Sequence, residues 1–150
     1  KNRRAGTENV PYIVGFAKAL ELGQKDLAEY RKRLDDYSNY LLNRLNEQGI
    51  HYRLNGPSIG KDRLPGNINL TFPDCDCHDL QYHLHRAGIY VSTSSACDSS
   101  NIEISHVIKA IYPNVEDHKD GAIRVSLGTD TKYEDIDAFV SEVINYINKG

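Results

Sequence analysis

Hydrophobic residues recur every three or four positions in the first third of the chain, which is the spacing of amphipathic helices. The apolar stretch 10–22 carries Pro11, a residue that a first helical turn tolerates, so a helix is predicted to start there. A second helix is predicted to end at Gly49, and the two helices are either separate or one helix kinked near Gly23. The apolar positions of the second helix are Leu27, Tyr30, Leu34, Tyr37, Leu41 and Leu45.

Helical spacing returns three times in the second half of the chain. One helix is predicted between Asp76, a suitable N-cap, and the terminator Gly88, and a short one over residues 104–112. The last helix is predicted to start with a capping box from Thr131 to Glu134. Its apolar stripe consists of Ile136, Phe139, Val140, Val143, Ile144 and Ile147.

Alternating or short apolar runs between these helices predict strands over residues 67–72, 89–92 and 122–128. The segment 54–67 is rich in glycine and proline and is predicted to be a surface loop. Few, short strands between helices favour an α+β domain, with a small, mainly antiparallel sheet and helices packed on one face.

Composition narrows the classes of function. A length of 150 residues suits one domain, and a net charge of -3 gives no support for binding nucleic acid or an anionic membrane. No apolar run approaches the ~20 residues of a membrane span, and no signal peptide is visible. Three cysteines do not form a disulfide framework, which favours the cytoplasm. The absence of methionine indicates a piece of a longer protein.

Cys97 lies among small and polar residues in the segment 90–100, "YVSTSSACDSS". A thiol on such a segment is either a mobile nucleophile or an incidental surface cysteine, because no base stands at a fixed distance from it.

Arg124 interrupts an otherwise apolar strand in "IRVSLG". An inward-facing arginine would need an anionic partner such as a carboxylate, whereas strand alternation equally permits an arginine that faces outward. The segment "RRAGTEN" before the first helix is either an anion cradle or a plain N-terminal loop.

The cluster "CDCH" offers metal ligands in Cys75, Cys77 and His78, with His83 following. The Cys-x-Cys spacing is tighter than in usual zinc sites and no second cysteine pair follows, so a strand-to-helix junction is favoured over a metal site.

Taken in order, "RAGTENV", "SSACDS", "SHVIKAI" and "IRVSLG" closely resemble the C-terminal part of the NifS/IscS-like cysteine desulfurases. These are pyridoxal-phosphate (PLP) enzymes of the class V aminotransferase superfamily. The resemblance covers nearly the whole chain, and it implies that residues 1–150 form a small C-terminal domain. The large PLP-binding domain would lie outside this chain.

The resemblance also implies roles for three residues. Cys97 matches the nucleophile that takes sulfur from L-cysteine and becomes a persulfide, leaving alanine. Arg124 matches the arginine that binds the substrate carboxylate, and Thr7 matches a residue that reaches the cofactor phosphate across a homodimer interface. A sulfur-acceptor protein, as in iron–sulfur cluster assembly, would be the partner.

The chain departs from the family at several positions. Thr129 stands where an arginine is frequent and Ile104 where proline is, and the lysine that binds the cofactor covalently is not in this sequence. The fragment alone is therefore predicted to be inactive. A selenocysteine lyase, an aminotransferase, or a stand-alone sulfur-relay or docking module are the alternatives.

Overall fold

A four-stranded antiparallel sheet stands at the centre of the part of the chain that the computed structural model describes, namely residues 5–73, 75–93, 105–115 and 121–148. The strand order is β1-β2-β4-β3, and every neighbouring pair is antiparallel. The strands are β1 (Arg53–Leu54), β2 (Asn67–Thr71), β3 (Ser92–Thr93) and β4 (Ala122–Ser126).

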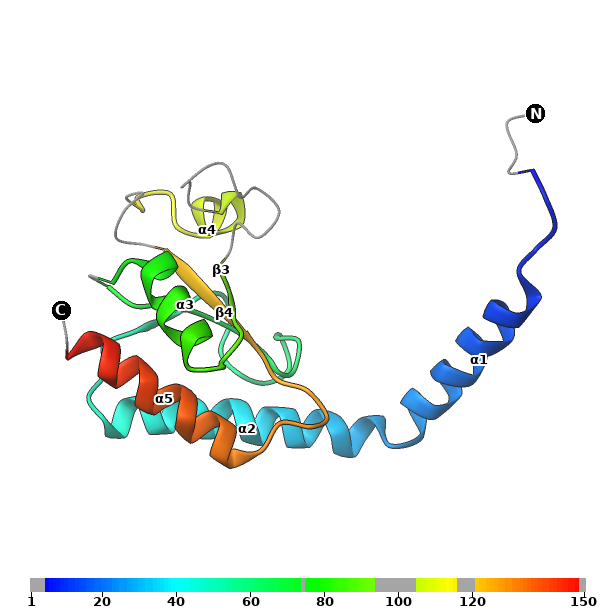
Figure 1. The fold of residues 1–150 in the computed structure, drawn as a ribbon, viewed down its shortest axis with the longest axis horizontal. Coiled ribbons are helices and arrows are strands. Elements are labelled where there is room, and N and C mark those ends of the chain that lie inside the picture. The colour runs from blue at the N-terminus through cyan, green and yellow to red at the C-terminus, as the bar shows by residue number, and fades with distance from the viewer. Residues whose placement is uncertain (1–4, 74, 94–104, 116–120, 149–150) are drawn as a thin grey trace.

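Five helices accompany this sheet in the described ranges, and Figure 1 shows α2 and α5 running side by side beneath it. They are α1 (Val10–Lys25), α2 (Leu27–Glu47), α3 (Cys77–Arg86), α4 (His106–Ile111) and α5 (Tyr133–Ile147). Of the two alternatives for the first third of the chain, two separate helices is the one observed: they meet at Asp26 and not near Gly23, and the φ of -124° and ψ of 25° at Asp26 are outside the helical range. Gly49 follows the end of α2 with a φ of +67°, a conformation that glycine adopts readily.

The hydrophobic core lies between one face of the sheet and the helices α2, α3 and α5. Strand alternation sends Ile68 and Leu70 of β2 and Ile123 and Val125 of β4 to this face. The helices contribute Leu41, Leu45, Leu80, Leu84, Ile136, Phe139, Val140 and Val143, all buried. The predicted α+β fold with helices on one face is thus confirmed.

Helix α4 lies over the opposite face of the sheet. Its Ile108 packs with Ala122 of β4 in a small apolar cluster of its own, separate from the main core. This helix therefore covers part of a face that the other strand residues leave polar.

Two local predictions were wrong by a few residues. Helix α5 starts at Tyr133, and its start is capped by the Asp135 carboxylate, which accepts a hydrogen bond from the Lys132 backbone at 2.9 Å. Thr131 is not the cap, because its hydroxyl accepts from the Gly128 backbone at 2.9 Å. Strand β3 begins after Val91, whose carbonyl instead accepts a hydrogen bond from the Gln81 side chain.

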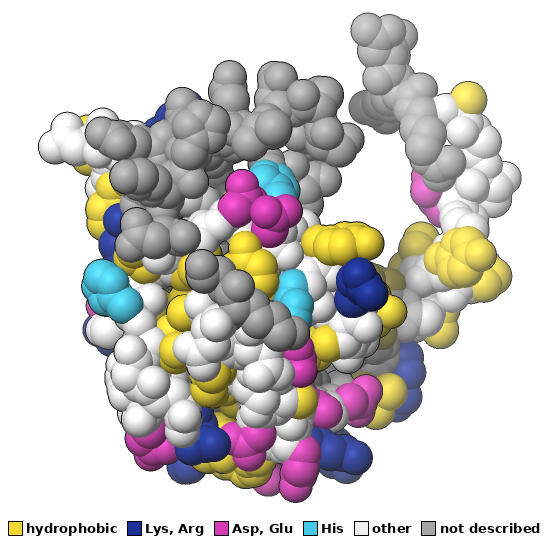
Figure 2. All heavy atoms as spheres, turned by 60° about the vertical axis from the view of Figure 1, so that its left-hand side comes forward, with side chains coloured by type: hydrophobic (Ala, Val, Ile, Leu, Met, Phe, Trp, Pro, Cys, Tyr) yellow, Lys and Arg dark blue, Asp and Glu magenta, His cyan; other side chains and the backbone are white. Residues whose placement is uncertain are grey.

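Helix α1 projects away from the domain body (Figure 1) and buries no residue against the rest of the described chain. Hydrophobic side chains are visible on the projecting segment in Figure 2, and the exposed ones in α1 are Val10, Tyr12, Ile13, Val14, Phe16, Leu20 and Leu22. Within the described residues, no helix has the length and apolarity that crossing a membrane requires.

Candidate functional site

The face of the sheet opposite the core carries a row of polar side chains. The register places Asn69 of β2 and Ser92 of β3 on either side of Arg124 of β4. Asn55 continues the row beyond Asn69, because its backbone N–H donates to the Asn69 carbonyl at 2.9 Å. The alternation of the strands that builds the core on one face therefore gathers polar groups on the other.

A cavity of about 390 Å³ lies over this polar row. The strands supply Asn69 and Arg124, the loop before β2 supplies Asn55 and Arg63, and α4 covers the cavity with apolar side chains such as Ile108. A concave site with convergent polar groups and an apolar wall is the usual form of a small-molecule site.

Asn55 forms the back of this site and is 4% exposed. Its amide nitrogen donates to the Asn69 side-chain oxygen at 2.7 Å and to the Thr71 hydroxyl at 3.0 Å, and its amide oxygen accepts from Arg53 Nε at 3.0 Å. Because the Asn69 oxygen is occupied in this way, the amide nitrogen of Asn69 is left to donate elsewhere.

The guanidinium of Arg124 has no hydrogen-bond or ion-pair partner among the described residues. The side chain is exposed on the face of β4 that points away from the core, as strand alternation permitted, and it also lines the cavity. Five N–H donors are therefore available to an anion that enters.

Arg63 lines the same cavity, but its guanidinium is held in place. Nε donates to the Pro57 carbonyl at 2.6 Å, Nη1 donates to the Asn67 carbonyl at 3.1 Å, and Nη2 donates to the Asn55 carbonyl. Gly56 makes room for it, since a Cβ atom there would lie 3.3 Å from Nη2, and its φ of +82° also favours glycine. Burial lowers the pKa of Arg63, although a guanidinium remains protonated at neutral pH.

Neither Asn55 nor Arg63 was among the residues that the sequence singled out. The segment 54–67 looked like an ordinary surface loop, and its one visible signal was an arginine between turn residues.

Thr7 is exposed in the segment that leads into α1, where the Asn9 side chain caps the helix by accepting from the Tyr12 N–H at 3.3 Å. A hydroxyl near a helix N-terminus is chemically suited to a phosphate group such as that of PLP, and Thr7 offers such a hydroxyl. Since α1 leads away from the sheet (Figure 1), the structure does not bring Thr7 to the Arg124 cavity. Cys97 lies outside the described residues.

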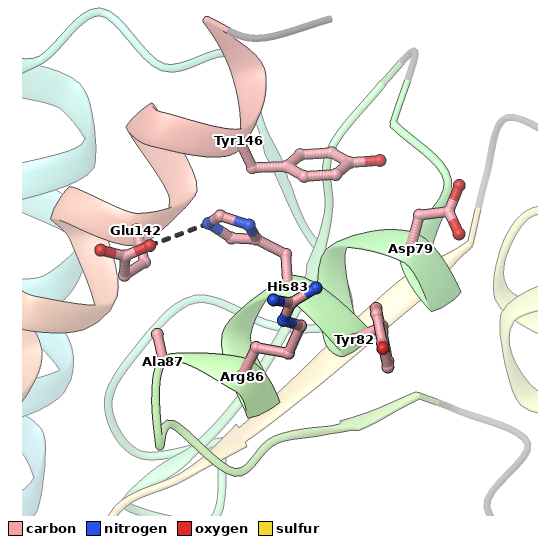
Figure 3. Close-up of a pocket in the computed structure, with 7 residues that line it drawn as sticks. All are labelled: Asp79, Tyr82, His83, Arg86, Ala87, Glu142 and Tyr146. Carbon is pink, nitrogen blue, oxygen red and sulfur yellow. Dashed lines mark hydrogen bonds and ion pairs between the residues drawn. The ribbon is translucent and has the colours of Figure 1, made fainter.

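The suggested metal ligands do not converge. His83 Nε2 lies 2.8 Å from Glu142 Oε2, and both residues line a cavity of about 590 Å³ between α3 and α5, to which Tyr146 also contributes (Figure 3). No group of three metal-binding side chains occurs in the described parts of the chain.

Cys77 lies at the first turn of α3 and is partly buried. Burial, with a smaller contribution from Asp76, raises the pKa of its thiol to about 11. Asp76 caps the helix by accepting from the N–H groups of His78 and Asp79. The strand-to-helix junction favoured by the sequence is what the structure shows.

Comparison with known proteins finds similar sequences over nearly the whole chain. The family model described as aminotransferase class-V matches residues 1–139. A cysteine desulfurase IscS of Dictyoglomus turgidum is 38% identical over 148 residues, which are 99% of this chain and 37% of that protein. A cysteine desulfurase IscS of Methanosarcina thermophila is also 38% identical, over 155 residues. The chain thus spans little more than a third of the length of these relatives.

A solved structure of a NifS-like protein superposes with a TM-score of 0.75 at 30% sequence identity. The superposition covers 98% of this chain and 36% of the other chain. The fold described above is therefore one that the NifS-like structure also contains.

Proposed function

This chain belongs to the aminotransferase class-V family, and from that premise we propose that it is the C-terminal domain of a PLP-dependent cysteine desulfurase. The observation that carries the proposal is the guanidinium of Arg124, which has no partner in the described parts of the chain and lines the cavity on the face of the sheet opposite the core. A carboxylate is an anion that a guanidinium binds in a bidentate way. The similarity to cysteine desulfurases makes L-cysteine the substrate that brings this carboxylate.

In the proposed reaction Arg124 orients the substrate by its carboxylate, and Cys97 receives the sulfur. The C–S bond of L-cysteine breaks and an S–S bond forms on Cys97, which yields L-alanine and a persulfide. PLP, when bound to the parent protein, would supply the electron sink that activates the substrate for this cleavage. Thr7 is the residue of this chain that would contact the cofactor phosphate, from across a homodimer interface.

The remaining part of the parent would cover the exposed apolar face of α1. A surface that is this hydrophobic on an isolated helix normally lies against another part of a protein. We expect the parent to act in the cytoplasm and to pass the sulfur to an acceptor protein.

Turnover of L-cysteine by the full-length, PLP-loaded protein tests the proposal. L-Alanine should form, and alkylation followed by peptide mass spectrometry should find the added sulfur on Cys97. Cys97→Ala should abolish the persulfide and alanine production, whereas the matched control Cys75→Ala should retain both. Alanine formation by Cys97→Ala at the parent rate would refute the role of Cys97.

The same assay separates the alternatives. A selenocysteine lyase would release selenium from selenocysteine but leave cysteine intact. An aminotransferase would produce a keto acid in place of alanine. A sulfur-relay module would form no alanine even as the full-length protein.

A further inference from the structure

The guanidinium of Arg63 carries a charge that no carboxylate neutralises within the described residues. Its three hydrogen bonds go to the backbone carbonyls of Pro57, Asn67 and Asn55, which are neutral groups. These bonds use three of its five N–H donors and fix its position in the wall of the cavity. The positive charge is therefore both fixed and available to act on a ligand.

The cavity has a strong excess of positive charge. Arg63 and Arg124 both line it, and the other described lining residues are asparagines, a serine and apolar side chains, with no Asp or Glu among them. Apolar side chains of α4, including Ile108 and Ile111, form part of its wall, so the field of the two cations is less screened there than in open water. Such a site attracts an anion more strongly than a single arginine does.

The two arginines differ in their freedom. Arg124 has no partner among the residues that the structure describes and can rearrange around a ligand. Arg63 is instead held by the loop 55–67 and cannot leave it without breaking three hydrogen bonds. Arg124 is therefore suited to contact the anion directly, and the fixed charge of Arg63 is suited to raise the local electrostatic potential that attracts it.

We propose that Arg63 is a positioning residue of the substrate site, whose fixed positive charge draws the substrate carboxylate into the cavity and holds it against Arg124. The inference rests on the proposed function for the identity of the substrate. The binding of a carboxylate to the cavity can nevertheless be measured without catalysis.

A purely structural role is the competing explanation, because the three hydrogen bonds also hold the loop 55–67 in shape. The pair of variants Arg63→Gln and Arg63→Lys separates the two. Glutamine removes the charge, while lysine keeps it but cannot reproduce the planar fork that joins three carbonyls. Arg31→Gln, an exposed arginine of α2, is the control for the loss of one positive charge elsewhere.

Steady-state kinetics of the full-length protein with L-cysteine, at low and high salt, give the first readout. Arg63→Gln should raise KM about three- to tenfold at low salt, with kcat within about twofold of the parent. It should also weaken the salt dependence of KM. Arg63→Lys and Arg31→Gln should remain within about twofold of the parent in both constants.

The second readout requires no turnover. Phenylglyoxal modifies accessible arginines, and acetate should protect Arg124 from it when a carboxylate occupies the cavity. The acetate concentration for half protection, followed by mass spectrometry, should rise about threefold or more in Arg63→Gln and stay unchanged in Arg63→Lys.

Equal losses in Arg63→Gln and Arg63→Lys, with an unchanged salt dependence, would overturn the proposal and leave Arg63 a structural residue. If the parent protein makes no alanine, the proposed function fails. The acetate experiment would then still decide whether Arg63 controls anion binding.

Discussion

Replacement of Arg124 by alanine in the full-length protein should impair substrate binding without affecting the fold. The side chain lies on the open face of β4, between Asn69 and Ser92, and its guanidinium has no partner in the described chain. Exposed residues without such contacts usually change the free energy of unfolding by less than about 0.5 kcal/mol when replaced. The substitution therefore removes a ligand contact and little else.

The size of the effect follows from the contact that is lost. A hydrogen bond to a charged group contributes roughly 1.5–3 kcal/mol, so kcat/KM for L-cysteine should fall by about one to two orders of magnitude. Most of the loss should appear in KM if the carboxylate is bound equally in the ground state and the transition state. Arg124→Lys should recover only part of it, because an ammonium group cannot form the bidentate pair.

The assay combines alanine production over a range of L-cysteine concentrations with thermal unfolding of each variant. Arg31→Ala is the matched control, because it removes an exposed arginine of α2 that does not line the cavity, and it should behave like the parent. An unchanged KM in Arg124→Ala would refute the assignment of the substrate carboxylate to this residue. A large fall in thermal stability would show that the side chain has a structural role instead.

Three further predictions concern the rest of the domain. The pH profile for alkylation of Cys77 in the parent protein should have its midpoint near 11, because burial raises the pKa of this thiol to about 11 and the thiolate is the reactive form; a midpoint near 9 would contradict this. Gly121→Ala should reduce the free energy of unfolding by about 1–3 kcal/mol in chemical denaturation, since its new methyl group would collide with Sγ of Cys77. The added substitution Cys77→Ala should reduce that loss. The ion pair with Arg44 lowers the pKa of Asp137, so its contribution to stability is complete above the ordinary value of 3.8 and is lost as pH falls below it. Asp137→Asn should therefore flatten the acid side of the stability profile, and an unchanged acid limb would refute this.

Local patterns in the sequence determined most of the secondary structure. The apolar stripe of α5, the Asp76 cap of α3 and the alternation of β4 all depend on near neighbours, and the structure has them close to where they were predicted. The start of α5 was misplaced because the Thr131 hydroxyl accepts a hydrogen bond from the Gly128 backbone and does not cap the helix. The Asp135 side chain caps it instead, and the sequence alone could not decide between these two residues.

The position of Arg124 illustrates the limit of such patterns. Alternation with Ile123 and Val125 permitted an arginine that faces away from the core, and the structure has it on that face. Alternation could not show that the opposite face is hollow, because the cavity exists only where α4 and the loop before β2 approach β4.

Asn55 and Arg63 were beyond the reach of sequence reasoning for the same physical reason. Each looks like an ordinary loop residue, and each acquires its place through partners on β1, β2 and the loop between these two strands. Helical and strand periodicity depend on residues a few positions apart, so the sequence by itself determined which segments form helices and strands and which faces are apolar. The site brings residues up to 69 positions apart, such as Asn55 and Arg124, to the wall of one cavity, and only the tertiary structure decided this arrangement.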